Sequence, residues 1–236
     1  MPLGKRDIWA GYPRDRLLIE GSLWSADHAR FSAEMERVDP FVDMYHVDVS
    51  DDHFVPGLLF FPDLVASIRP FTKHPLHVHL MTEHLPGLID DFARAGADLI
   101  TVHCECGPLV PDALEDIHRR NAGAGIALRL DSPADLLAPY LDAVDLALLM
   151  GTPVGVKGVD LSPHAADRIG AVQELLAERG LRDKVKIEAD GGIRQHTVPG
   201  LCEAGADIIV MGSLLFKSAD LAVTSAWVRS LREQRR

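Results

Sequence analysis

The chain has 236 residues, of which 47% are hydrophobic and 25% are charged, so its composition matches ordinary globular usage and excludes a disordered chain. Its 35 acidic and 24 basic residues give a formal net charge of −11, the opposite sign from a typical nucleic-acid binder. No apolar run approaches the roughly 18 residues that a membrane-spanning helix needs. We therefore expect neither nucleic acid nor a membrane as a partner. A small anionic substrate stays open, because helix N-termini bind phosphate whatever the net charge.

The chain has three cysteines, Cys104, Cys106 and Cys202. This odd number does not make a disulfide framework, which indicates a reducing compartment. Residues 1–16 lack the continuous apolar core of a signal peptide. We therefore expect a cytoplasmic protein.

Short apolar runs alternate along the chain with amphipathic segments of helical period. The predicted strands are Leu17–Gly21, Met44–Asp48, Leu76–Leu80, Leu99–His103, Gly125–Leu130, Leu146–Met150, Lys186–Asp190 and Asp207–Met211. The predicted helices include Asp27–Val38, Leu85–Ala95, Asp112–Asn121, Ala165–Arg179, Thr197–Ala204 and a last one near Ala219–Glu233. This alternation predicts βαβ units and a parallel sheet.

Eight such strand–helix pairs close into a (β/α)8 barrel, a fold that this chain is long enough to form. The alternative, an open doubly wound sheet, would carry a G-x-G-x-x-G turn after its first strand, and the sequence Gly21–Asp27 lacks one. Because no linker or composition break divides the chain, we predict a single barrel domain over residues 1–236 with a short N-terminal extension, residues 1–16. Trp9 and Tyr12 in this extension predict packing against the barrel or against a neighbouring subunit.

The sequence Ala-Gly-Ala-Asp occurs twice, at residues 95–98 and 204–207, each time between a predicted helix and a predicted strand. A glycine there can adopt the left-handed conformation that ends a helix. The repeat therefore predicts a recurring helix-to-strand loop, a feature of architecture rather than of chemistry.

The active site of a (β/α)8 barrel lies at the C-terminal ends of its strands. His46 and Asp48 end the second predicted strand and share one face of it, His79 lies near the end of the third, and Asp190 ends the seventh. For any one of these residues alone, a loop cap or a solvent-exposed position is the simpler interpretation. Four of them buried without partners would cost several kcal/mol, a cost that a metal ion would offset. Two imidazoles and two carboxylates suit a divalent ion such as zinc, manganese or iron.

Other polar residues near the same strands are assigned structural positions. His77 shares a face with His79 but lies one layer deeper, which predicts a hydrogen-bonded interior histidine. The run His103-Cys104-Glu105-Cys106 offers four metal-ligand types in a row. Because neighbours in an extended run alternate faces, these four cannot converge on one ion, and we predict ordinary loop or barrel residues.

Several blocks of the sequence resemble the ribulose-phosphate 3-epimerase family. They are Gly21–Asp27, His46–Pro56, His77–Met81, Asp190–Ile193 and the tail motif Val210–Phe216. The resemblance extends from about Leu18 to Phe216 with the strands in the same order, and the second-strand block is the most specific. It implies a (β/α)8 TIM barrel of the ribulose-phosphate-binding type.

The resemblance also implies a metal-dependent epimerase that inverts C3 of a ketose phosphate, either ribulose 5-phosphate/xylulose 5-phosphate or a related tetrulose or hexulose phosphate. It implies that one divalent ion (Zn, Mn, Fe or Co) is held by His46, Asp48, His79 and Asp190, and that Asp48 and Asp190 form the catalytic acid–base pair. The implied substrate-binding residues are Ser22, His79, Met81, Gly191, Gly192, Gly212 and Ser213. Because family members are often oligomers, a homo-oligomer is expected.

This chemistry makes physical sense for the residues present. Inverting a carbon beside a ketone requires a proton to leave one face and another to arrive on the opposite face, which two carboxylates can achieve. The intermediate enediolate is negatively charged, and a divalent ion would stabilise it.

The chain departs from the family pattern at three places. Ser50-Asp51-Asp52 stands where the family has Met-Asp-Gly, and Gly57 stands where it has asparagine. After the sixth strand, the family's glycine-rich phosphate loop is replaced by Met150–Gly158, which keeps Gly155 and Gly158 with Lys157 between them. Lys157 either contacts an anionic group as a point charge or faces solvent. These changes leave the acid–base residues in place and suggest a paralogue for a related ketose phosphate, with ribulose 5-phosphate still the first candidate.

The sequence leaves two alternatives to an epimerase. A sugar-phosphate decarboxylase of the same barrel superfamily would place a lysine in an Asp-x-Lys-x-x-Asp arrangement, whereas Asp48 is followed by Val49-Ser50-Asp51-Asp52. A non-catalytic sugar-phosphate-binding barrel could keep the glycine amides but would have no reason to keep both carboxylates.

Overall fold

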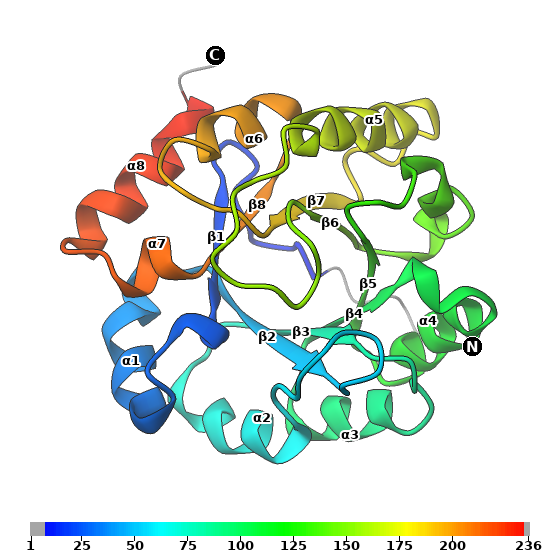
Figure 1. Cartoon of the computed structure of the whole chain (residues 1–236), viewed down its shortest axis with the longest axis horizontal. Helices are drawn as coiled ribbons and strands as arrows, with labels where there is room; N and C mark the ends of the chain where they lie inside the picture. The colour runs from blue at the N-terminus through cyan, green and yellow to red at the C-terminus, as the bar shows by residue number, and fades with distance from the viewer. Residues whose placement is uncertain (1–7, 234–236) are drawn as a thin grey trace.

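Eight parallel strands follow one another around a closed barrel, each paired with the next in sequence, and β8 pairs with β1 (Figure 1). The computed structural model describes residues 8–233. The strands are β1 (Leu18–Ser22), β2 (Met44–Ser50), β3 (Leu76–Met81), β4 (Leu99–His103), β5 (Gly123–Leu128), β6 (Leu146–Met150), β7 (Lys186–Asp190) and β8 (Ile208–Met211). The predicted barrel is confirmed, although β5 begins two residues before the predicted Gly125.

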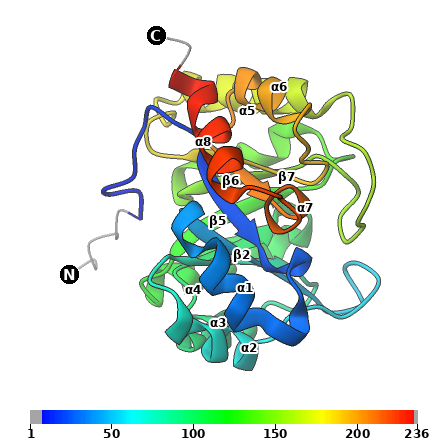
Figure 2. The ribbon, with the colours of Figure 1, turned by 90° about the vertical axis from the view of Figure 1, so that its left-hand side faces the viewer.

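The helices surround the barrel on its outer side (Figures 1 and 2). They are α1 (Phe31–Val38), α2 (Pro62–Ile68), α3 (Leu88–Ala95), α4 (Val110–Arg119), α5 (Ala165–Glu178), α6 (Val198–Ala204), α7 (Ser213–Phe216) and α8 (Leu221–Glu233). Helices α2 and α7 were not predicted from the sequence. Two short 3₁₀ turns, Ala134–Leu137 and Leu141–Ala143, take the place of a full helix between β5 and β6. Within residues 8–233, no helix combines the length and the apolar composition needed to cross a bilayer.

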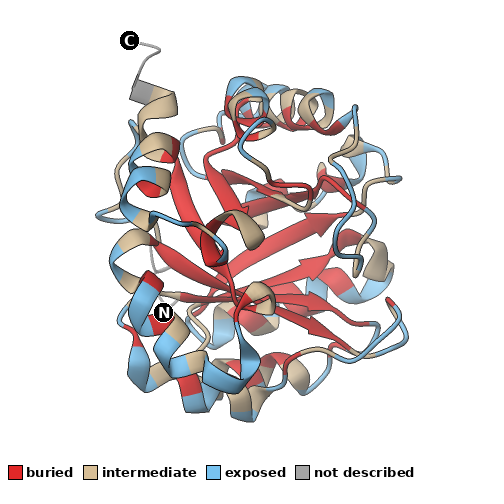
Figure 3. Ribbon diagram, turned by 60° about the vertical axis from the view of Figure 1, so that its left-hand side comes forward, coloured by how far each residue is buried: buried red, intermediate tan, exposed pale blue. Residues whose placement is uncertain are grey.

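The strands are buried on both faces (Figure 3), as expected for a parallel sheet covered by helices. Apolar side chains on the outer face of the barrel pack against the helices. Inside, the layer nearest the N-terminal ends of the strands is apolar and contains Leu18, Met44, Leu99, Leu146 and Ile208. The polar side chains lie above this layer, toward the C-terminal ends of the strands, where barrel active sites form.

The N-terminal segment lies at the end of the barrel opposite the long loops that follow β2 and β6 (Figure 2). Trp9 and Tyr12 pack against the apolar layer inside that end. The Trp9 indole Nε1–H donates to the Asp145 carbonyl at 2.9 Å, and the Tyr12 hydroxyl donates to the Asp43 carbonyl at 3.1 Å. The sequence left open whether this segment packs against the barrel or against a neighbouring subunit, and in the structure it packs against the barrel.

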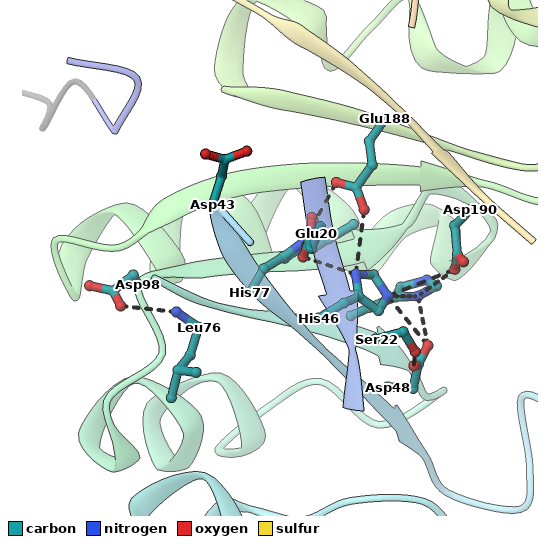
Figure 4. Close-up of polar contacts among 12 residues, drawn as sticks. Glu20, Ser22, Asp43, His46, Asp48, Leu76, His77, Asp98, Glu188 and Asp190 are labelled. Atoms are coloured by element: carbon teal, nitrogen blue, oxygen red, sulfur yellow. Dashed lines mark hydrogen bonds and ion pairs between the residues drawn. The ribbon is translucent and has the colours of Figure 1, made fainter. Parts of the chain in front are cut away.

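Four aspartates at this same end connect neighbouring strands through side-chain hydrogen bonds. Each lies directly before an even-numbered strand, and its Oδ2 accepts the backbone N–H of a residue at or near the start of the preceding strand. The bond from the Leu76 N–H to Asp98 is 3.1 Å long (Figure 4). The other three are Asp43 from Ile19 (2.8 Å), Asp145 from Ala124 (2.9 Å) and Asp207 from Ile187 (2.9 Å). Gly96 and Gly205, with φ of 105° and 115°, end the helices before two of them. The Ala-Gly-Ala-Asp repeat is therefore a helix end followed by this aspartate.

Replacing Asp207 by asparagine is expected to lower the free energy of unfolding by about 2–3 kcal/mol at neutral pH. The side chain is 3% exposed, and its carboxylate accepts hydrogen bonds from Arg182 and Arg232, each at 2.8 Å. Asparagine can keep the bond to the Ile187 N–H but removes the charge that both guanidinium groups face. Urea unfolding of Asp207→Asn beside the exposed control Asp183→Asn measures the effect, and coincident curves for the two variants would contradict it.

The same effect has a defined pH dependence. Burial raises the pKa of the Asp207 carboxyl, but Arg182 and the neighbouring cations outweigh this and hold it below its ordinary value. Because the folded-state pKa is depressed, the stabilisation is present above the unfolded pKa and is lost as the pH falls through the folded value. The stability difference between the wild-type chain and Asp207→Asn should therefore shrink in strong acid.

Candidate active site

The C-terminal end of the barrel contains a cavity of about 550 Å³. Asp48 from β2 and Asp190 from β7 lie at its floor. Among the other predicted site residues, Ser22, Met81, Gly155, Lys157, Gly158, Gly191, Gly192, Gly212 and Ser213 also line it. His46 and His79 lie behind the two aspartates and are fully buried. The structure thus places every predicted site residue in or directly behind one cavity.

The four predicted metal ligands meet at one point. His46, Asp48, His79 and Asp190 each offer one ligand atom, and these atoms all lie within 4.8 Å of one another. His46 Nε2 lies 3.3 Å from Asp48 Oδ1, 3.7 Å from Asp190 Oδ2 and 3.3 Å from His79 Nδ1 (Figure 4). Ligand atoms of a tetrahedral ion with bonds of about 2.0–2.2 Å are spaced by roughly 3.3–3.6 Å. This spacing fits a divalent ion without large rearrangement.

The far nitrogen of each of these two histidines is also provided with a partner. His46 Nδ1 lies 3.1 Å from Glu20 Oε1. His79 Nε2 lies 2.8 Å from His103 Nε2, and His103 Nδ1 lies 3.2 Å from Glu105 Oε2. A proton on each far nitrogen can therefore be donated toward a carboxylate, directly or through His103, which leaves the near nitrogen free to bind a metal. The donor set of the described residues fits a divalent ion.

The contribution of His103 and Glu105 was not predicted from the sequence. Cys104 and Cys106 do not belong to either of the clusters of potential metal ligands in the described part of the chain. Residues His103 and Glu105, two apart, nevertheless contact each other beside His79. Neighbouring residues of an extended run alternate between its two faces, so residues two apart share a face. This rule excludes one metal site for all four residues of the run His103–Cys106, but it would have placed His103 and Glu105 on the same side.

The two aspartates at the cavity floor differ in their electrostatic surroundings. Burial raises the pKa of the Asp48 carboxyl, but the His46 and His79 rings outweigh this and hold it below its ordinary value. The Ser22 hydroxyl donates to Asp48 Oδ2 at 3.0 Å, which also favours the ionised form. Burial raises the pKa of Asp190 to about 7, and the nearby Asp48 carboxylate adds to this increase.

The rim of the cavity is basic, in contrast to its acidic floor. Three cationic side chains from separate loops line it: Lys157, Arg194 and Lys217. Only Lys157 was predicted from the sequence. The Lys157 ammonium donates to the Trp24 carbonyl and lies 4.3 Å from the centroid of the Trp24 ring. Lys157 is therefore held at the rim of the cavity, which favours the anion-binding interpretation over a freely solvated side chain.

Glycine is required after Asp190 for steric reasons. Gly191 and Gly192 have φ of 89° and 70°, a backbone conformation that other residues rarely adopt. A Cβ on Gly191 would overlap Thr152, and a Cβ on Gly192 would lie 2.6 Å from Leu161 Cα. The two glycines allow this loop to approach the loop after β6 closely.

The chain is similar to known proteins over most of its length. The sequence model of the Ribulose-phosphate 3 epimerase family matches residues 18–216. Ribulose-phosphate 3-epimerase from Synechocystis sp. is 37% identical over 217 residues, 91% of this chain and 94% of that protein. The enzyme of that name from Bacillus subtilis is 36% identical over 203 residues, 86% of this chain and 93% of that protein.

Among solved structures, 3-keto-L-gulonate-6-phosphate decarboxylase from Vibrio cholerae matches with a TM-score of 0.71, covering 93% of this chain and 98% of that chain. At 15% identity this likeness concerns the fold alone. The family model matches residues 18–216, which include all four predicted ligands, and the two relatives are above 30% identity over most of the chain. The chain therefore belongs to the ribulose-phosphate 3-epimerase family.

Proposed function

We propose that the chain inverts C3 of a ketose phosphate, interconverting ribulose 5-phosphate and xylulose 5-phosphate or the epimers of a related tetrulose or hexulose phosphate. As a member of its family it is an isomerase of the epimerase type. The observation that carries the proposal is the position of Asp48 and Asp190. They project from two different strands into one cavity, and a carboxylate oxygen of each lies within 4.8 Å of the other.

In the proposed reaction, one aspartate removes a proton and the other supplies one. The Asp48 carboxylate takes the C3 hydrogen as a proton, and the electron pair of the C–H bond moves toward the C2 ketone oxygen to give an enediolate. The Asp190 carboxylic acid then donates its proton to the opposite face of C3, and the ketone re-forms. The product has the same atoms as the substrate with C3 inverted, and the two aspartates exchange roles in the reverse direction.

The proposed cofactor is one divalent ion (Zn, Mn, Fe or Co) held by His46, Asp48, His79 and Asp190. It would supply positive charge where the enediolate becomes negative. The chain itself holds the Asp48 carboxylate in place through the Ser22 hydroxyl, and Met81, which is 1% exposed, covers part of the cavity wall.

The remaining predicted residues form the proposed binding site for the phosphate group. One cavity is lined by Gly191, Gly192, Gly212, Ser213, Gly155, Lys157, Gly158, Arg194 and Lys217. The first four would offer backbone N–H groups to the phosphate. A negatively charged end of the substrate would be attracted to this rim and kept away from the acidic floor. Binding energy at the phosphate could then orient C3 between the two aspartates.

A decarboxylase is disfavoured by the residue that stands at the position of its lysine. That residue is Ser50, which is 5% exposed and donates its hydroxyl to the Gly57 carbonyl at 2.7 Å. No cationic side chain therefore follows Asp48 on β2. A non-catalytic barrel is disfavoured because the buried Asp48 and the partly buried Asp190 destabilise the fold and serve no purpose in holding a sugar phosphate.

Incubation with a panel of ketose phosphates in deuterated water tests the proposal. The expected result is epimerisation with deuterium appearing at C3, because the proton donated by the second aspartate comes from solvent. A clear preference for ribulose 5-phosphate would argue against a paralogue with another substrate. Absence of exchange for every sugar would overturn the epimerase, and release of carbon dioxide from a β-keto acid sugar phosphate would identify a decarboxylase.

Replacing Lys157 by methionine is expected to raise KM about tenfold, equivalent to about 1.4 kcal/mol of binding, with little change in kcat. The substitution keeps the length of the side chain and removes the charge at the cavity rim. Lys184→Met, an exposed lysine near the opposite end of the barrel, is the matched control. Unchanged KM for Lys157→Met would return Lys157 to the solvent-facing interpretation.

A further inference from the structure

A second group of potential metal ligands lies deeper in the barrel, below the first. Glu20, His46, His77 and Glu188 each offer one ligand atom, these atoms lie within 4.8 Å of one another, and all four residues are 0% exposed. We propose that this group, here called the deep cluster, binds a second divalent metal ion. His46 would then bridge the two ions, with Nε2 toward the first and Nδ1 toward the second.

The spacing of the atoms in the deep cluster supports a metal site. Glu20 Oε1 lies 3.1 Å from His46 Nδ1 and 2.8 Å from His77 Nδ1. Glu188 Oε1 lies 3.4 Å from His46 Nδ1, and Glu188 Oε2 lies 3.5 Å from His77 Nδ1 (Figure 4). Carboxylates and imidazoles thus alternate around a common centre. The two Glu188 spacings fall within the roughly 3.3–3.6 Å expected for the edges of a tetrahedron around a zinc-sized ion, and the two shorter Glu20 spacings would widen when an ion enters.

Hydrogen bonding alone does not satisfy this cluster. The two imidazole nitrogens that face the carboxylates, Nδ1 of His46 and of His77, both lie at hydrogen-bond distance from the same oxygen, Glu20 Oε1. His77 Nε2 is used elsewhere, with the Thr101 hydroxyl at 2.7 Å. Within the described residues, Glu20 Oε2 and both oxygens of Glu188 have no hydrogen-bond partner. A buried carboxylate without donors is strongly unfavourable, and a cation at the centre would remove that penalty.

The charges of the barrel interior lead to the same conclusion. The first group, His46, Asp48, His79 and Asp190, is here called the upper group. When ionised, Asp48 and Asp190 supply two negative charges to it, and Glu20 and Glu188 supply two more to the deep cluster. One divalent ion balances only the upper pair. A second divalent ion balances the lower pair. When the His46 ring binds both ions, its Nδ1 proton is released to solvent and the ring becomes an imidazolate, so one negative charge is left over the two centres together.

Counting the ions bound to each chain tests the proposal. Metal-free protein is loaded with excess Co²⁺ and desalted, and its cobalt is measured by mass spectrometry beside the visible d–d absorption. The expected result is two ions per chain for the wild type, one for Glu188→Gln or Glu20→Gln, and two for the exposed control Glu178→Gln. The number of cobalt ions bound to the wild-type chain tests the proposal even where a deep-cluster variant fails to fold.

One cobalt ion per wild-type chain would overturn the proposal and leave a proton as the cation of the deep cluster. Two ions in a folded Glu188→Gln variant would also overturn it, because the second ion would then lie elsewhere. The proposal does not depend on the epimerase activity. A chain that binds two ions but fails to exchange C3 of any sugar would refute the proposed function and support the deep cluster.

Discussion

Asparagine in place of either Asp48 or Asp190 is expected to lower kcat/KM for epimerisation by about 10²–10⁴-fold, the usual contribution of a general acid or base. Each variant keeps one carboxylate, which can still remove the C3 proton of the epimer that presents its hydrogen to that side. We therefore expect Asp48→Asn and Asp190→Asn to exchange deuterium into opposite epimers, while neither converts one epimer into the other at an appreciable rate.

Exchange into each pure epimer, followed by nuclear magnetic resonance in deuterated water, measures this pattern. Asp52→Asn is the matched control, because it removes an exposed carboxylate near Asp48 while its side-chain oxygen can still accept the Gly57 N–H. Metal content determined on the same samples separates loss of a proton carrier from loss of an ion. Exchange of both epimers by both variants would contradict the two-carboxylate mechanism.

The barrel could be predicted from the sequence because its strands are buried on both faces. Such strands appear as short apolar runs, and all eight were found with the correct order. Helix α2 was missed because it has only seven residues, follows the apolar stretch 58–61 and begins with a proline. A segment of that length gives too few turns for its helical period to be recognised.

The upper group of ligands could be predicted for a different reason. His46 and Asp48 are two residues apart on one strand, and the C-terminal ends of all barrel strands meet at one rim, so local spacing was sufficient. The interior position predicted for His77 is confirmed by its contacts with Glu20 and Thr101.

Glu20 and Glu188 received no role, because each is a single charged residue within an apolar run. Their meeting with His77 depends on the register of strands around the closed barrel: β1 pairs with β8, and β8 pairs with β7. No single segment of the sequence contains that information. The homo-oligomer and the cytoplasmic location stay predictions, since neither follows from the fold of one chain.

Removing divalent ions with a chelator is expected to abolish epimerisation and to lower the melting temperature. Glu20, Asp48 and Glu188, which are buried, and the partly buried Asp190 then lose the positive charge that offsets the removal of their carboxylates from water. Because the ions bind only the folded chain, adding them back raises stability by mass action, about 2.7 kcal/mol at one hundred times the Kd.

Differential scanning fluorimetry and the epimerase assay, run on the same metal-free protein, follow the two effects together. Zn²⁺, Mn²⁺, Fe²⁺ or Co²⁺ should restore both, because each accepts imidazole and carboxylate ligands. Mg²⁺ is the control, since it prefers six oxygen ligands and keeps several waters that a buried pair of histidines cannot replace. Full activity in protein shown to be free of metal would mean that the two histidines and two aspartates act by proton transfer alone, with the imidazolium form of His46 supplying the positive charge.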